Sequence, residues 1–207
     1  HLPLTDITFH YAGEEFFKGS QKQGFDFYSF HLYYRGNNFL KAVALGDYEL
    51  NFGQGLLVAS GFGVSKSSLV TSIKYGGRTL RPYTSVNEFN FFRGGAAVVG
   101  TENISLTAFA SSKKIDGNIG TVDTLGEDVF VTSIGGDGLH RTTSEVANKN
   151  TVQQTVTGAN ADFRIRSLTL GASAIYSKYS VPLIPSFQPY NQFKFRGDQL
   201  TNFGIHY

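Results

Sequence analysis

The chain has 207 residues, with 24 Gly, 19 Phe and 11 Tyr but no Cys, Met or Trp, and this bias favours strands and turns over helices. Its 18 Lys and Arg against 16 Asp and Glu leave a net charge of +2, too balanced to predict a nucleic-acid partner. The lack of Cys excludes a disulfide framework and a Cys-ligated metal, and no apolar run approaches the roughly 18 residues of a transmembrane helix.

Alternation of apolar and polar residues predicts about ten β-strands. In chain order we expect them around residues 6–12, 26–35, 39–45, 47–53, 92–99, 104–113, 127–134, 161–166, 168–176, 192–196 and 202–207. Turn residues at 35–38 and 100–103 separate two neighbouring pairs of these strands.

Four of the expected strands alternate most clearly, with apolar residues on one face and polar or small residues on the other. The residues that share the apolar faces are Tyr28, Phe30, Leu32 and Tyr34; Tyr48, Leu50 and Phe52; Leu168, Leu170, Ala172, Ala174 and Tyr176; and Phe203, Ile205 and Tyr207.

Two features favour a transmembrane barrel over a soluble sandwich. The polar faces are rich in Ser, Thr, Asn and Gly as well as charge, as a water-filled lumen allows. Tyr residues lie at the ends of the apolar faces, as in the aromatic girdles at the level of lipid headgroups: Tyr28 and Tyr34, and Tyr176 and Tyr179. Because alternation also fits soluble all-β proteins, a soluble ligand-binding domain stays open as an alternative.

Two segments do not read as simple strands. Residues 53–91 are loop-rich, and in a barrel they would lie in the lumen or in a loop. Residues 136–150 contain the one expected short helix, capped by Thr143 or Ser144, with Glu145 in its first turn where the helix dipole favours a carboxylate.

The chain is expected to be an internal piece of a longer protein, because it contains no Met and its last residues stop within a strand pattern. About ten strands with truncated ends would leave open sheet edges in lipid, where backbone groups cannot remain unpaired. Further chain or other subunits are therefore expected to close the barrel.

Several runs resemble the barrel region of the helix-hairpin-helix-containing outer-membrane proteins of Bacteroidota. They are NFGQGL (51–56), GFGVSKSS (61–68), RTLRPYTSVNEFNFFRG (78–94), LTAFASSKKIDGNI (106–119) and GLHRTTSEVANKN (138–150), of which RPYTSVNE with the following FFRG is the most specific. The resemblance covers most of residues 40–180 and implies an outer-membrane barrel without implying a particular activity. Nucleic acid would be bound only by the helix-hairpin-helix repeats of that family, which these residues do not include.

A basic cluster in and beside the loop-rich segment is the best candidate for function. If the segment folds into the lumen, its side chains would form a charged constriction that selects anionic solutes. Alternatively, the same charges tie an inward loop to the barrel wall through ion pairs with Asp47, Glu49 or Asp162, since buried charges are normally paired. The cluster comprises Lys66, Lys74, Arg78, Arg81, Tyr83, Glu88 and Arg93.

Other motifs point to no chemistry. Residues 61–68 depart from a phosphate-binding loop because Ser65 stands where a Gly must precede Lys66. Asp137, His140 and Arg141 are close in sequence, but a His beside an Arg on a loop is usually a surface group. The His residues at positions 1, 10, 31, 140 and 206 include no pair at metal-ligand spacing, so no metal, cofactor or catalytic residue is predicted.

The sequence therefore predicts an all-β, antiparallel transmembrane barrel, with residues 1–207 forming part of one barrel domain. The expected location is the bacterial outer membrane, and the expected partners are the lipid bilayer, lipopolysaccharide and other outer-membrane or periplasmic subunits. The expected function is that of a pore, transporter or assembly component and not an enzyme. A plugged structural or partner-docking barrel and the soluble ligand-binding domain are the alternatives.

Overall fold

The computed structural model describes residues 6–15, 25–53, 55–59, 78–85, 89–121, 129–136, 140 and 142–207. This part of the chain is all-β, as predicted, with one short helix and one 3-10 turn at Pro189–Asn191. The elements are β1 (Asp6–Glu15), β2 (Phe25–Arg35), β3 (Leu40–Leu50), β4 (Leu80–Pro82), β5 (Phe92–Gly100), β6 (Ile104–Ile115), β7 (Gly117–Thr121), β8 (Val129–Ile134), α1 (Thr143–Asn148), β9 (Val152–Ile165), β10 (Leu168–Leu183) and β11 (Gly197–His206).

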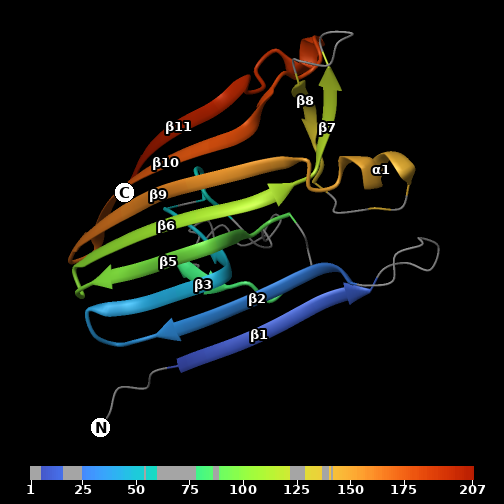
Figure 1. Cartoon of the computed structure of the whole chain (residues 1–207). Coiled ribbons are helices and arrows are strands. Elements are labelled where there is room, and N and C mark those ends of the chain that lie inside the picture. Colours follow the sequence, from blue (N-terminus) through green and yellow to red (C-terminus); the bar gives the residue numbers. More distant parts are fainter. Residues whose placement is uncertain are drawn as a thin grey trace, which may run out of the picture.

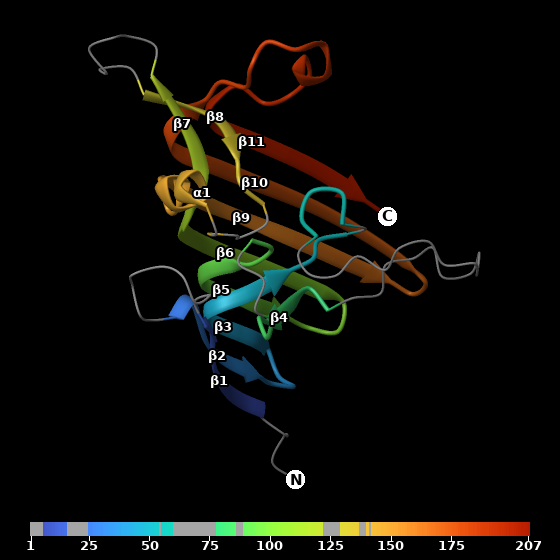
Figure 2. The same ribbon diagram turned by 90° about the vertical axis from the view of Figure 1, so that its right-hand side faces the viewer.

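Eight of these strands form one antiparallel wall in the order β1-β2-β3-β5-β6-β9-β10-β11. The wall curls into a half-barrel with β1 at one edge and β11 at the other (Figure 1). The β7–β8 hairpin joins the far end of β10 through a parallel bridge between Val131 and Leu183. The short β4 pairs with the last residues of β3 on the concave side of the wall (Figure 2).

The two ends of the wall differ in the length of their connections. At one end, residues 36–39, 101–103 and 166–167 make short turns between β2 and β3, β5 and β6, and β9 and β10. At the other end, the chain between β3 and β5 includes β4, the chain between β6 and β9 includes β7, β8 and α1, and residues 184–196 connect β10 to β11. All the long connections described in the chain, and the short elements within them, therefore lie at one end of the wall.

Over most of the wall the outer face is apolar, and the inner face carries both polar and apolar side chains. Large apolar side chains on the convex face are exposed: Phe30, Leu32, Leu45, Ile104, Leu106, Phe163, Leu168, Leu170, Phe203 and Ile205. Polar side chains on the concave face are buried: Ser29, His31, Thr107, Ser111, Asn160 and Ser173. The faces agree with those predicted from alternation, and the apolar face is the outer one.

The concave side is filled by residues that follow Gly46, where β3 separates from β2 while Asp47 and Tyr48 still pair with β5. This Gly has a φ of +93°, and a Cβ there would lie 2.2 Å from the Phe30 carbonyl oxygen, so the position requires glycine. Beyond it β3 no longer pairs with β2 and turns inward. We call residues 47–59 and 78–85, as far as they are described, the inward segment.

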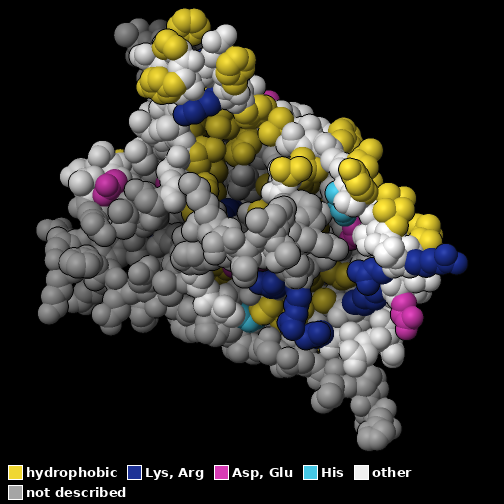
Figure 3. Space-filling model, turned by 180° about the vertical axis from the view of Figure 1, so that it is seen from behind, with side chains coloured by type: hydrophobic (Ala, Val, Ile, Leu, Met, Phe, Trp, Pro, Cys, Tyr) yellow, Lys and Arg dark blue, Asp and Glu magenta, His cyan; other side chains and the backbone are white. Residues whose placement is uncertain are grey.

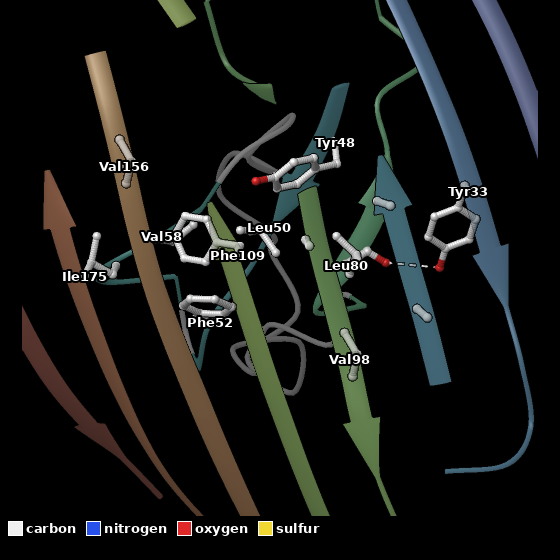
Figure 4. Close-up of a cluster of buried hydrophobic side chains, with 13 residues drawn as sticks. Tyr33, Tyr48, Leu50, Phe52, Val58, Leu80, Val98, Phe109, Val156 and Ile175 are labelled. Carbon is white, nitrogen blue, oxygen red and sulfur yellow. Dashed lines mark hydrogen bonds between the residues drawn. The ribbon is translucent and has the colours of Figure 1, made fainter. Parts of the chain in front are cut away.

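The inward segment packs on the wall through an apolar core (Figure 4). Tyr48, Leu50 and Phe52 are at most 2% exposed, and they contact the wall through a cluster that includes Phe109 and Ile175. The Phe52 and Phe109 rings meet edge to face with centroids 5.7 Å apart. Tyr48 anchors its hydroxyl on the wall by donating to the Ala110 carbonyl at 2.8 Å. The alternation of residues 47–53 was predicted correctly, and its apolar face points into the molecule.

Near the long connections, the long strands have the polarity of a soluble sheet, with apolar side chains inside and polar side chains outside. Ile115, Val131 and Val152 are buried together, and Tyr179 and Leu183 pack against them. On the opposite face the corresponding positions carry polar side chains such as Ser112, Lys114, Gln153 and Lys178. The long strands therefore have an apolar outer face near the short turns and a polar one near the long connections.

Several predicted boundaries need correction. Residues 192–196 are not a strand: they form turns after the 3-10 helix, and the strand begins at Gly197. Residues 39–45 and 47–53 belong to one strand bent at Gly46, and β4 and β7 were not predicted. The short helix is present, but its cap is Thr142, whose hydroxyl accepts from the Glu145 amide in a capping box. In the described residues, no helix is long and apolar enough to cross a bilayer.

Candidate functional site

The basic cluster predicted from the sequence is divided by the fold. Lys66, Lys74 and Glu88 lie outside the described residues. Arg78 is exposed, and Arg81 in β4 is the cross-strand partner of Glu49 in β3. Opposite charges at such positions stabilise a strand pair by about 0.2–1 kcal/mol.

Tyr83 and Arg93, the other two members, lie at the place where the inward segment meets the wall. Tyr83 is 1% exposed and stacks on Phe91 with ring centroids 4.9 Å apart. Its amide donates to the Asp47 carbonyl oxygen at 3.2 Å. Arg93 lies on β5 opposite Asp47 on β3.

Arg93 and Asp47 form an ion pair that bridges the gap left where β3 turns away from β2. Arg93 Nε donates to Asp47 Oδ1 at 2.7 Å, and its terminal nitrogen donates to Asp47 Oδ2 at 2.9 Å. The same nitrogen reaches the Tyr28 carbonyl of β2 at 2.7 Å, and the Phe30 amide donates to Asp47 Oδ2 at 3.2 Å. The pair thus replaces the missing backbone bonds between β2 and β3. An ion pair with Asp47 was one of the structural roles considered for the basic cluster, as the alternative to a charged constriction.

Lys113 extends this group along the concave side of the wall. It is 8% exposed, and its ammonium donates to the Phe89 carbonyl oxygen at 2.6 Å. The ammonium also lies 4.2 Å from the centroid of the Phe91 ring, a cation–π geometry. Lys113 was not named as a site residue, although its alternation with Phe109 and Ser111 places it on the inner face. We call Asp47, Tyr83, Phe91, Arg93 and Lys113 the latch.

A second polar group ties β11 to the rest of the wall near the short-turn end. His206 Nε2 lies 2.8 Å from Asp162 Oδ1, and Asn160 donates to Asp162 Oδ2 at 2.7 Å. The Ser173 hydroxyl in turn donates to the Asn160 side-chain oxygen at 2.7 Å. Asp162, named above as an ion-pair partner for the basic cluster, thus binds His206, and the two residues are too far apart in sequence for spacing to reveal the pair.

His140 is buried and not a free acid–base group. Its Nε2 lies 2.9 Å from Asp116 Oδ2, while Asp116 Oδ1 accepts from the Asn150 amide at 2.8 Å. Asp137 and Arg141, its predicted neighbours in an acid–base group, lie outside the described residues. The contacts hold the start and end of the helical connection against the β6–β7 turn. Within the described part of the chain, no three His, Asp or Glu side chains group to hold a metal.

The outer face carries the other candidate surface, an apolar band with a sharp upper limit. At this limit the outward side chains change from apolar or aromatic to polar, from Ala110 to Ser112 on β6 and from Tyr176 to Lys178 on β10. Figure 3 shows hydrophobic side chains gathered along the rim where β11 lies. Phe203 and Ile205 of β11 are exposed. We call the outward apolar positions below this limit the outer band.

Comparisons with known proteins give no neighbour from which to transfer a function. No protein-family model matches the chain, and no curated protein or solved structure matches it either.

Proposed function

We propose that the chain forms part of the wall of an outer-membrane β-barrel whose lumen is plugged by the inward segment. The observation that carries the proposal is the apolar outer face of the wall, where large apolar side chains are exposed while several polar side chains are buried on the inner face. In water such a face would be costly at about 25 cal/mol for each Å² of exposed apolar surface, whereas lipid removes that cost. The resemblance to the barrel region of Bacteroidota outer-membrane proteins supports the same reading.

The slant of the outer band supports a membrane orientation. On β2 the band runs from Tyr28 to Tyr34, and on β9 it runs from Ala159 to Ile165. A single hydrogen-bonded row joins Tyr34 to Ala159, through Val43, Ala97 and Ala108. The band therefore descends by six residues, about 20 Å, over four strand spacings of about 19 Å in total. It would be level in a membrane if the strands tilted by about 45°, close to the roughly 35–45° of membrane barrels.

The height of the band supports the same orientation. On β10 it runs from Leu168 to Tyr176, which is about 27 Å along a strand. At a tilt of about 45° this corresponds to about 19 Å along the membrane normal, comparable with the apolar band of about 25 Å in outer-membrane barrels. Tyr176 then lies at the interface, where aromatic girdles occur. Short turns face the periplasm in such barrels, so the long connections would face outward.

The apolar core between the wall and the inward segment favours the plugged barrel over an open pore. Tyr48, Leu50 and Phe52 fill the space in front of Phe109 with apolar side chains, and the Tyr48 hydroxyl is bonded to the wall. In this proposal the charges at Arg93 and Lys113 hold the plug in place, and they do not line a permeation route. The chain would then serve as a structural or partner-docking barrel, or pass solutes only when the plug moves.

The experiment that tests the membrane assignment places one new charge at two depths on the outer face. Ala172→Arg lies within the outer band, whereas Ser112→Arg lies above its limit. Arginine facing lipid near the midplane costs about 2–4 kcal/mol, falling to about 0–1 kcal/mol near the interface. We expect Ala172→Arg to lower the fraction of full-length protein that folds into outer-membrane lipid vesicles, measured by mobility of unheated against heated samples on gels, and Ser112→Arg to fold normally.

Two results would refute the assignment. One is equal folding of both variants in vesicles, because a soluble sheet has no depth dependence. The other is recovery of the unmodified protein in the soluble fraction without detergent, in which case the outer band would be a buried or ligand-binding surface of a soluble protein.

A further inference from the structure

The edge strand β11 carries the outer band but has a neighbour on one side only. In the described residues it pairs with β10 alone. Its Phe203 and Ile205 are 76% and 88% exposed, whereas Phe163 and Ile104, inside the wall on the same face, are 44% and 45% exposed. The difference is the area that a further strand beside β11 would cover. In lipid such an edge must be paired, because its backbone groups find no water.

The strand β1, at the other edge, is antiparallel to β11 and would give a closed barrel of eight strands. Strands about 4.8 Å apart and tilted by about 40° give such a barrel a circumference of about 50 Å and a backbone diameter of about 16 Å. That interior is just wide enough for the wall's own side chains. It cannot also hold the β3–β4 ribbon of the inward segment.

The inward segment requires a barrel wider than one of eight strands. Stacked sheets lie about 10 Å apart, so a ribbon that packs on the wall and faces an opposite wall needs about 20 Å between the two. That width corresponds to ten or more strands at the same tilt. The observed curl requires more strands still, because the eight wall strands make only a half-barrel. A full circle of that curvature takes about sixteen strands, with a diameter of about 32 Å.

We propose that β11 pairs with an antiparallel transmembrane strand of the same polypeptide that lies outside these 207 residues, and not with β1. This rests on the membrane barrel proposed above. Neighbouring wall strands follow one another along the chain at β1–β2, β2–β3, β5–β6, β9–β10 and β10–β11, so the next neighbour of β11 is expected to be the next transmembrane strand. Beside Phe203 and Ile205 that strand carries apolar side chains towards lipid, and beside Asn202 and His206 it carries small or polar ones.

The distance between the two edges tests the proposal directly. The chain has no Cys, so Glu14→Cys on β1 and Ile205→Cys on β11 can each carry one spin label in full-length protein with any other Cys replaced. Because the outer band descends by six residues over four strand spacings, Glu14 near one end of β1 and Ile205 near the opposite end of β11 lie at about the same height in a tilted barrel. Electron–electron resonance is measured in lipid vesicles, after the gel-mobility shift has shown that the labelled protein is folded. We expect a label separation of about 30 Å, the diameter of a barrel of about sixteen strands.

Each other outcome overturns the proposal. Adjacent strands lie about 5 Å apart, so a separation below about 15 Å that persists on dilution with unlabelled protein means that β1 and β11 pair within one chain. A short separation that vanishes on dilution means that a second copy supplies the strand beside β11. Protein that is not recovered with the membrane refutes the proposed function itself, which distinguishes that failure from a wrong strand count.

Discussion

The ion pair between Arg93 and Asp47 should be far more sensitive to loss of the base than to loss of the acid. Asp47 is 1% exposed and accepts two bonds from Arg93 and one from the Phe30 amide. Arg93→Met leaves that buried carboxylate with the Phe30 amide as its remaining donor. Breaking a buried pair in this way costs about 3–5 kcal/mol, and we expect about 3 kcal/mol because the Arg93 side chain is 44% exposed and already partly solvated.

The reverse change, Asp47→Asn, should cost less. It leaves the guanidinium in contact with water and still bonded to the Tyr28 carbonyl, and the Asn side chain keeps an acceptor for the Phe30 amide. A lost charge-assisted hydrogen bond of this kind costs about 1.5–3 kcal/mol, and partial exposure of Arg93 should keep the loss near the lower value. The double variant should be less unstable than the sum of the two single variants, because it removes the stranded charge.

The assay is urea unfolding of the full-length protein in lipid vesicles, followed by the fraction that keeps the mobility of the folded form on unheated gels. Arg196→Met serves as a control, since it removes an exposed arginine from the β10–β11 connection. Equal losses for Arg93→Met and Asp47→Asn, or strictly additive losses in the double variant, would show that the pair does not bridge β2 and β3 as described.

Three further outcomes follow from the fold. Gly46→Ala should lower the free energy of unfolding by at least about 2 kcal/mol, because its Cβ would meet the Phe30 carbonyl oxygen at 2.2 Å. An unchanged urea midpoint for this variant would contradict the inward turn. Phe109→Ala should loosen the inward segment by about 3–5 kcal/mol and raise the conductance of reconstituted protein, and unchanged conductance would argue against a plug held by this contact. Thr142→Ala should cost about 1 kcal/mol locally, seen as faster hydrogen exchange within residues 143–148 with unchanged exchange in the wall strands.

Period-two alternation predicted most of the wall because it is a local property of extended chain. The faces of β2, β10 and β11 follow from which residues are apolar, and the fold places them as expected. The sequence could not show that Tyr48, Leu50 and Phe52 face inward, because an apolar face reads the same whether lipid or protein covers it. That distinction is made by Gly46, whose left-handed conformation depends on its contact with Phe30 in the neighbouring strand.

The candidate site was less predictable than the wall. Arg93 was named in the basic cluster and Asp47 as one of three acids that could pair with it, but the pair depends on a register between strands that the sequence does not specify. Lys113 was missed because a lone lysine on a strand usually reaches solvent. Its burial follows from Phe89 and Phe91, which the chain brings back to the wall after the inward segment.

The position of the inward segment along the chain constrains the order of assembly. Residues 51–91 separate β3 from β5 in the sequence, yet these two strands are neighbours in the wall. The inward segment between them lies on the concave side of the wall. Joining the two strands closes a long loop, which makes the contact slow to form, and in the proposed barrel the segment would have to be in place before further strands complete the wall. In that barrel the segment could leave only by breaking its contacts with the wall, since β3 and β5 hold both of its ends. The persistence of the folded form should then be set by the rate of breaking these contacts more than by the equilibrium stability of the core.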